Sequence, residues 1–205
     1  MDTAFPPAAG RSDLTLRKVT TRIVRVPLRF TLGTSADVVR TVPMVLADLL
    51  TDQGITGRAY AFGYTDAGAT AIAALLLEVG ERTAGLAAAP LPLADLLARR
   101  YRLLGVTGAV RMALSTFDMA LWDAQAQAGN CSLADLLGAR RRTMRAYDSR
   151  GLGLMPPGPL VDEALRLIAD RNLPAIKLRL GHPTLAEDIA AVTAVRDALP
   201  ASVGL

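Results

Sequence analysis

The chain has 205 residues, 51% of them hydrophobic and 20% charged, a balance that allows a sizeable core and excludes general disorder. It has no apolar run of the ~20 residues that a membrane helix needs, and its first residues do not resemble a secretory signal, so we expect a cytoplasmic protein that contacts no membrane. The net charge of +4 comes with dispersed arginines and few aromatic residues, which favours a solvated basic surface over nucleic-acid binding.

The first part of the chain predicts an antiparallel meander of three strands. After a leader at 1–13 that we expect to be disordered, apolar and polar residues alternate over 14–28, which indicates a strand. A glycine-containing loop at 30–37 follows. The segments 42–50 and 55–63 then flank the sequence TDQG, which is typical of a compact turn between paired strands.

Helical patterns follow the meander. Four segments have the apolar spacing or the end signals of helices: 66–85, 92–105, 107–129 and 132–139. Asp66 is the expected N-cap of the first of these, and Pro92 is the expected start of the second. Gly138 is the expected stop of the last.

From about residue 143 the pattern alternates between strand and helix. The predicted strands are 143–150, 175–180 and 202–205, and the predicted helices between them are 158–172 and 184–200. Short connections of this kind imply parallel strands. We therefore expect a domain boundary near 140–143, where the arginine run at 140–142 lies.

Two cations stand two residues apart in the apolar strand predicted at 175–180. Lys177 and Arg179 share one face of that strand, and the apolar residues point the other way: Ile176, Leu178 and Leu180. In a β/α barrel the apolar set would pack against helices, and the cations would face the interior near the strand's C-terminal end, where barrel active sites form. Buried cations require an anion; the alternative is an edge strand with its cations in water.

Two long motifs carry a family resemblance. AYDSRGLG at 146–153, followed by AIKLRLGHPTLAEDIAAVTAVRDAL at 175–199, is similar to the start of the barrel in mandelate racemase. ALSTFDMALWDAQAQAGNCSLADLLGA at 113–139 resembles the helix-and-loop signature of the mandelate racemase and muconate lactonizing family, with small departures at Thr116 and Phe117. Over about 14–205 the sequence thus resembles this family of the enolase superfamily.

The resemblance implies a fold in two parts. An α+β capping domain at 14–142, consisting of the antiparallel three-stranded meander and helices, precedes the first βα units of a TIM-type (β/α) barrel at 143–205. A complete barrel has roughly 250 residues and eight strands, so we expect the barrel domain to be truncated in this chain.

The resemblance also implies residue roles. Lys177 matches the first lysine of the family's K-x-K strand, which polarises the substrate carboxylate, and Ser149 matches a hydroxyl that hydrogen-bonds this carboxylate. Phe62 and Tyr64, with the loop Phe30–Ser35, match parts of the capping domain that close over the substrate. From the residues alone, Phe62 and Tyr64 would be ordinary packing residues at a strand end.

Arg179 departs from the family pattern, because it stands where the family has the lysine base that removes the α-proton. Arginine is effectively always protonated, but it can fork onto a carboxylate or enediolate oxygen. We therefore expect Arg179 to act as an electrostatic clamp, with proton abstraction left to a group on the opposite face. This arrangement favours a one-face reaction, such as dehydration of an acid sugar, over two-base racemisation or epimerisation.

The implied substrate is a small carboxylate, an α-hydroxy acid or acid sugar, and the implied cofactor is Mg²⁺, which stabilises an enediolate. In the family the metal ligands follow the third, fourth and fifth barrel strands and would lie beyond Leu205. We therefore expect no metal ligand in this chain and no catalysis by the chain alone. A full-length relative would be a magnesium-dependent lyase or isomerase and a homo-oligomer.

Two hypotheses of other classes stay open. The chain could be a non-catalytic interaction module that binds a partner through its uncovered apolar face. A flavodoxin-like domain is the other hypothesis, and both the meander and the lack of a phosphate-binding loop count against it.

Four further residues suggest chemistry only weakly. His182, the only histidine, has no carboxylate partner nearby in the pattern and is interpreted as a loop residue. Asp118 and Asp123 lie about 140° apart around a helix, so we expect structural roles and not a chelating pair. Cys131 has no histidine near it in sequence, which indicates an inert thiol.

Overall fold

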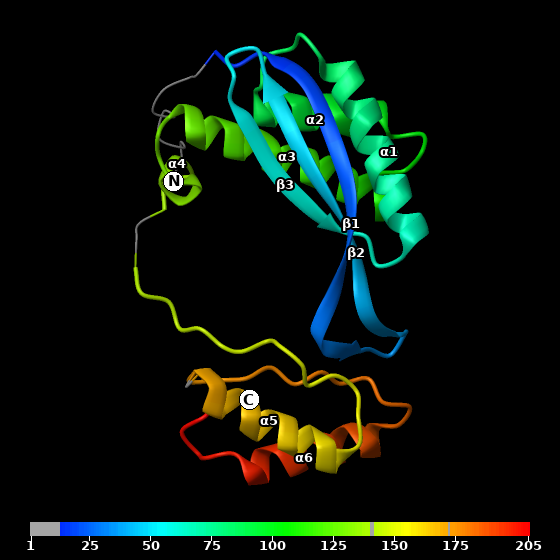
Figure 1. Ribbon diagram of the computed structural model, residues 1–205, viewed down its shortest axis with the longest axis vertical. Helices are drawn as coiled ribbons and strands as arrows, with labels where there is room; N and C mark the ends of the chain where they lie inside the picture. Colours follow the sequence, from blue (N-terminus) through cyan, green and yellow to red (C-terminus); the bar gives the residue numbers. More distant parts are fainter. Residues whose placement is uncertain (1–12, 140–141, 172) are drawn as a thin grey trace, which may run out of the picture. The chain divides into compact units, whose positions relative to one another are not determined.

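The computed structural model describes residues 13–139, 142–171 and 173–205 (Figure 1). Apart from Asp13, the predicted leader lies outside the described residues, as do Arg140 and Arg141. The chain divides into two compact units. The first unit consists of Met1–Val26 and Val42–Arg141, and the second of Pro27–Thr41 and Arg142–Leu205. The tip of the first hairpin thus belongs with the C-terminal residues, and the domain bounds drawn from the sequence stay a prediction.

The predicted meander is confirmed. The strands β1 (Leu16–Gly33), β2 (Val38–Thr51) and β3 (Thr56–Phe62) form one sheet in the order β1-β2-β3. The strands β2 and β3 are antiparallel and meet at the TDQG turn. Strand β1 runs further than predicted, because Phe30–Gly33 is extended, and the predicted loop at 30–37 shortens to a tight turn.

In the described part of the first unit, four helices follow the sheet: α1 (Asp66–Thr83), α2 (Pro90–Arg100), α3 (Gly108–Ala128) and α4 (Leu133–Leu136). The predicted N-cap of α1 is wrong by one residue. Thr65 has the extended backbone that a cap requires, and its side chain accepts from the amide of Gly68. Asp66 is already helical and instead pairs with Arg25 of β1 at 2.9 Å. Helix α2 starts at Pro90, two residues before the predicted Pro92.

The core of the first unit lies between the sheet and its helices. Helix α3 packs on β3 and on α1, and Figure 1 shows these helices together on one side of the sheet. The apolar face expected for α3 is buried at Val110, Ala113, Phe117, Leu121 and Ala124, whereas its sixth residue, Leu114, is half-buried. No helix in the described part of the chain is long and apolar enough to cross a membrane.

The second unit contains the helices α5 (Pro157–Arg171) and α6 (Leu185–Ala198), which pack against each other. The three predicted strands form no regular ladder. Between the residues that the structure describes in this region, parallel pairing is limited to the bridges Asp148↔Ile176 and Ala175↔Gly204. The parallel direction is therefore as predicted, but Gly151 and Leu152 have positive φ values of 58° and 48°, which interrupts an extended strand.

Ile176, Leu178 and Leu180 were predicted to face the helices. The prediction is confirmed for the first two. Ile176 is buried with residues of α5 and α6, and Leu178 packs at the edge of the same cluster. The prediction is wrong for Leu180, whose exposed fraction is 52%. Arg179 is the last residue of this segment whose amide bonds to the neighbouring backbone among the described residues, so Leu180 already lies beyond the paired region.

Candidate active site

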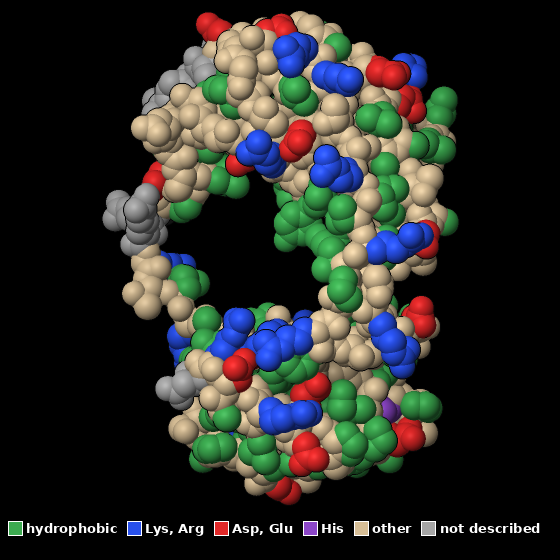
Figure 2. Space-filling model, in the orientation of Figure 1, with side chains coloured by type: hydrophobic (Ala, Val, Ile, Leu, Met, Phe, Trp, Pro, Cys, Tyr) green, Lys and Arg blue, Asp and Glu red, His purple; other side chains and the backbone are tan. Residues whose placement is uncertain are grey.

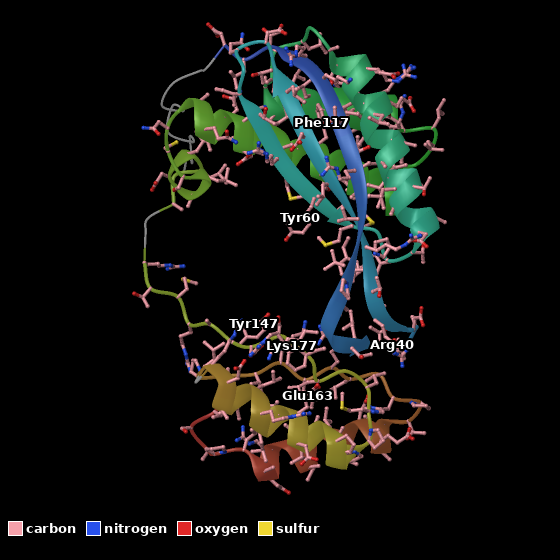
Figure 3. All side chains as sticks on the ribbon, viewed as in Figure 1. Arg40, Tyr60, Phe117, Tyr147, Glu163 and Lys177 are labelled. Atoms are coloured by element: carbon pink, nitrogen blue, oxygen red, sulfur yellow. The ribbon has the colours of Figure 1, made fainter. Side chains whose placement is uncertain are left out.

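Lys177 and Arg179 lie on the face of the strand segment that is turned away from the helices. The amide of Lys177 donates to the carbonyl of Asp148 at 2.8 Å, and that of Arg179 donates to the carbonyl of Leu152 at 3.1 Å. Because side chains alternate along extended backbone and Ile176 is buried against the helices, both cations point to the open face. Lys177 is exposed and lines an open cavity of about 700 Å³ with Tyr147 (Figure 3).

Ser149 shares this open face. Its neighbour Asp148 is buried on the helix side, whereas Ser149 is exposed. Arg179 is held more firmly than Lys177, since its Nη1 donates to the carbonyl of Gly151 at 2.8 Å. A guanidinium has five N–H donors, so this bond leaves Arg179 able to meet an anion. The second unit therefore carries a hydroxyl and two cations on one surface, where Figure 2 also shows Lys and Arg side chains gathered.

Phe62 and Tyr64 belong to the first unit. Their rings lie 4.6 Å apart at an interplanar angle of 56°. Tyr64 is 64% exposed and has a φ of 58°, a strained backbone region for a residue with a side chain. The amide between them, that of Gly63, donates to the carbonyl of Pro43 at 2.8 Å. The end of β3 thus presents an aromatic pair on a hydrogen-bonded backbone, with Phe62 half-buried and Tyr64 exposed. The role of this pair towards a substrate stays a prediction.

A buried ion pair beside Ser149 was missed by the sequence analysis. Arg150 forks onto Asp148, with Nη2 2.6 Å and Nε 3.0 Å from carboxylate oxygens, and its Nη1 reaches Asp170 at 2.8 Å. Asp148 is only 4% exposed, and the bonds from Arg150 hold the pKa of its carboxyl below the usual value. The available signal was the pattern D-S-R, which places opposite charges on one strand face and the serine on the other.

His182 has a carboxylate partner, contrary to the sequence interpretation. Its Nδ1 lies 2.8 Å from Asp188 Oδ1, and Asp188 also accepts the amides of Gly181 and His182, both at 3.0 Å. Asp188 lies six residues further along the chain, in the first turn of α6, and the loop folds back so that the two groups meet. These donors, the two amides first and the ring second, lower the pKa of Asp188.

Acid should therefore weaken this loop. Ionised Asp188 contributes stability above its unfolded-state pKa of about 3.9, and the contribution is lost as the pH falls through the lower folded-state pKa. We expect Asp188→Asn to reduce stability at pH 7 and the gap to the unchanged protein to close towards pH 2. Denaturant midpoints measured between pH 7 and pH 2 give this difference in stability. Asp197→Asn, at an exposed position of the same helix, is the control and should change little; a constant gap for Asp188→Asn would contradict the assignment.

The aspartates of α3 have structural surroundings. Asp123 Oδ2 accepts from the amide of Arg58 and the side chain of Gln127, both at 2.7 Å. Asp118 lies beside Trp122 in a pocket of about 240 Å³, where burial raises the pKa of its carboxyl. Cys131 is exposed.

The described residues do not form a magnesium site. Within 13–139, 142–171 and 173–205, no group of three or more His, Cys, Asp or Glu side chains could hold a metal ion. Asp148, the neighbour of Ser149 in the chain, and Asp170 are instead bound to Arg150. Residues of this part of the chain therefore do not fit the metal that the resemblance implies.

This chain is similar to several known proteins. L-talarate/galactarate dehydratase of Salmonella typhimurium is 39% identical over 95 residues, which cover 46% of this chain and 24% of that protein. Hydrophobic dipeptide epimerase of Roseobacter litoralis is 38% identical over 76 residues, which cover 37% of this chain and 21% of that protein. An enolase structure from Bradyrhizobium, complexed with magnesium and mandelic acid, superposes with a TM-score of 0.83 and 34% identity over 95% of this chain and 53% of that chain.

The chain therefore spans about half the length of this solved structure, and the aligned segments cover a quarter or less of the two curated relatives. The family model described as mandelate racemase / muconate lactonizing enzyme, N-terminal domain, matches residues 16–138. This match covers the meander and the helices α1 to α4, so the predicted fold class is confirmed. The chain belongs to the mandelate racemase / muconate lactonizing enzyme family of the enolase superfamily.

Proposed function

We propose that this chain provides the capping domain and the first substrate-binding strands of an enzyme that removes the α-proton of a hydroxy acid or acid sugar. Dehydration is the favoured outcome, and racemisation or epimerisation is the next. The names of the relatives, a sugar-acid dehydratase and an epimerase, support this chemistry. The observation that carries the proposal is the shared open face of Ser149, Lys177 and Arg179.

These three side chains bind the substrate carboxylate. As the α-proton leaves, negative charge moves onto the carboxylate oxygens, and donors already aimed at those oxygens stabilise it without rearranging. Lys177 supplies a full charge and Ser149 a neutral hydroxyl donor. Arg179, fixed by its bond to Gly151, clamps the substrate and does not take up the proton, because a guanidinium stays protonated. The base then acts from the opposite face of the substrate.

Mg²⁺ is the cofactor that we propose for the complete active site, on the basis of the magnesium named with the Bradyrhizobium enolase. Because the described residues do not fit the ion, we propose that the 205-residue chain by itself is inactive.

A fusion of this chain with the C-terminal half of a relative tests the proposal. The C-terminal half of the Salmonella dehydratase is fused after Leu205, and dehydration of galactarate and L-talarate is assayed with Mg²⁺. We expect no turnover by the chain alone and turnover by the fusion. Lys177→Ala should lower kcat by about 10²–10³-fold, whereas Lys18→Ala, which changes the other lysine and is exposed on β1, should not. A folded but inactive fusion would favour the interaction-module hypothesis.

Arg179→Lys tests the clamp. Lysine can act as a base when neighbouring cations lower its pKa, and Lys177 lies two residues away. In the active fusion we expect the variant to exchange the substrate α-hydrogen with solvent deuterium at least about tenfold faster, since a positioned base typically contributes about 10²–10⁴-fold. Exchange is followed by NMR. An unchanged exchange rate would exclude this position from the proton-transfer geometry.

A further inference from the structure

The helices α2 and α3 form an antiparallel pair with an open groove between them. Gln125, near the end of α3, donates to the carbonyl of Ala88, just before α2, at 2.5 Å, while a short turn joins the other ends of the two helices. The groove has a volume of about 240 Å³, and its lining includes the apolar side chains of Leu91, Leu114 and Trp122. Leu91 is 70% exposed, so the groove presents apolar surface to solvent.

Two opposite charges lie along the α3 side of this groove. Arg111 and Asp118 both line it. They are seven residues apart, close to two helical turns, which places them on the same side of α3 about 10 Å apart along its axis. Among the described residues, neither forms an ion pair within the chain. One side of α3 thus carries a cation and an anion without charged partners.

The surroundings of Asp118 favour the approach of a cation. Its side chain is half-buried, and this burial raises the pKa of its carboxyl, although a hydrogen bond from the indole of Trp122 acts in the opposite direction. A neutral indole N–H stabilises a carboxylate less than a guanidinium does. Because apolar walls weaken the screening by water, a guanidinium brought to Asp118 would be attracted more strongly than at an open surface.

The position of the two charges makes this side of α3 complementary to itself. Leu114 and Ser115 lie midway between Arg111 and Asp118. When two α3 helices pack antiparallel about a two-fold axis at this midpoint, the Arg111 of each copy meets the partner's Asp118, since both charges are equally far from the axis. A two-fold interface joins the same patch on both copies, and this patch meets that condition with opposite charges.

The same rotation covers the remaining apolar surface. The turn between α2 and α3 lies about as far before the midpoint of α3 as Trp122 lies after it, so the turn of one copy reaches the Trp122 end of the partner's groove. This turn carries Leu103 and Leu104, which are 100% and 68% exposed. Two helix pairs joined in this way form a four-helix bundle, in which apolar side chains from facing helices make the core.

We propose that the α2–α3 groove is the interface between two copies of this chain, in a two-fold dimer held by two reciprocal Arg111–Asp118 pairs. Every residue of the interface belongs to the first unit. The proposal therefore does not depend on the proposed function or on the open strand edge of the second unit.

Reciprocal charge reversal on the 205-residue chain tests the pairing. Arg111→Asp leaves two anions in each groove and Asp118→Arg leaves two cations, so each variant alone should dimerise at least about 30-fold more weakly than the unchanged chain. An equimolar mixture of the two should dimerise about as tightly as the unchanged chain, because both pairs form again between unlike copies. Sedimentation velocity measures all four samples.

Glu81→Arg is the control for charge reversal in general. Glu81 is exposed on α1 and does not line the groove, so its reversal should leave the dimer unchanged. Folded single variants that dimerise alone, or a mixture that stays monomeric, would overturn the proposal. An unchanged chain that is monomeric at micromolar concentration would overturn it as well.

The fluorescence of Trp122 shows which surface associates. It is the single tryptophan of the chain, and the dimer removes it from water, so its emission should move to shorter wavelength as the concentration rises through the dissociation constant. Association without this shift would mean that another surface is used, and would overturn the proposal.

Leu91→Glu covers the case in which Asp118→Arg does not fold. Leu91 is largely exposed, so the change has little effect on the single chain, but in the dimer it buries a charge without a partner. We expect dimerisation to weaken at least about tenfold. Unchanged dimerisation of the folded variant would exclude the groove as the interface.

Discussion

Replacing Phe117 by alanine lowers the free energy of unfolding of the first unit by about 3–5 kcal/mol, the usual cost of truncating a fully buried phenylalanine. Phe117 is 2% exposed on α3 and belongs to the cluster that joins α1, α3 and the sheet. Helix α3 also contacts α1 and α2, so the cavity left by the ring would be enclosed from several sides and could collapse only in part.

Urea denaturation followed by tryptophan fluorescence measures this change, since the single tryptophan, Trp122, lies on the same helix. Met119→Ala is the matched control. Met119 is 47% exposed on α3, and its truncation should change stability by no more than about 0.5 kcal/mol. Equal losses for the two variants would mean that the core does not lie between the sheet and α3.

Replacing Arg150 by methionine destabilises the second unit by more than the loss of an exposed ion pair would, because it leaves the carboxylate of Asp148, which is only 4% exposed, without its partner. The bonds from Arg150 are also what keeps the pKa of Asp148 low, so in the variant this carboxyl tends to take up a proton. The double replacement Arg150→Met with Asp148→Leu removes both charges, and it should recover most of the loss.

Hydrogen exchange of the α5 amides measures this effect, because the second unit contains no tryptophan. The control is Arg82→Met in the pair with Glu78 on α1, whose side chains are both 42% exposed. Its effect is measured by exchange of the α1 amides, and exposed pairs contribute no more than about 1 kcal/mol. If Arg150→Met and Arg82→Met have the same small effect, the Asp148–Arg150 pair is not buried as described.

The electrostatic pairs show why part of the site was not predictable. The alternation of Ile176, Lys177 and Leu178 was enough to predict which side chains meet the helices, because strand periodicity is a local property. Asp148 and Asp170 are 22 positions apart in the chain, and only the packing of α5 onto the preceding segment lets Arg150 bridge them. His182 and Asp188 are closer in sequence, yet their bond depends on the left-handed turn at Gly181, whose φ of 125° no apolar pattern reveals.

By itself, the sequence determined the order of the elements, the meander, the apolar face of α3 and the family motifs, because these depend on local periodicity, turn residues and spacing. Only the tertiary structure showed that the tip of the first hairpin, Pro27–Thr41, belongs to the second unit. Its attachment depends on the close approach of Gly33 and Gly153, on Phe30 lying against Arg150, and on Ser35 touching Gly181. These contacts join residues more than 100 positions apart, and the shape and charge that make them exist only once the second unit has folded.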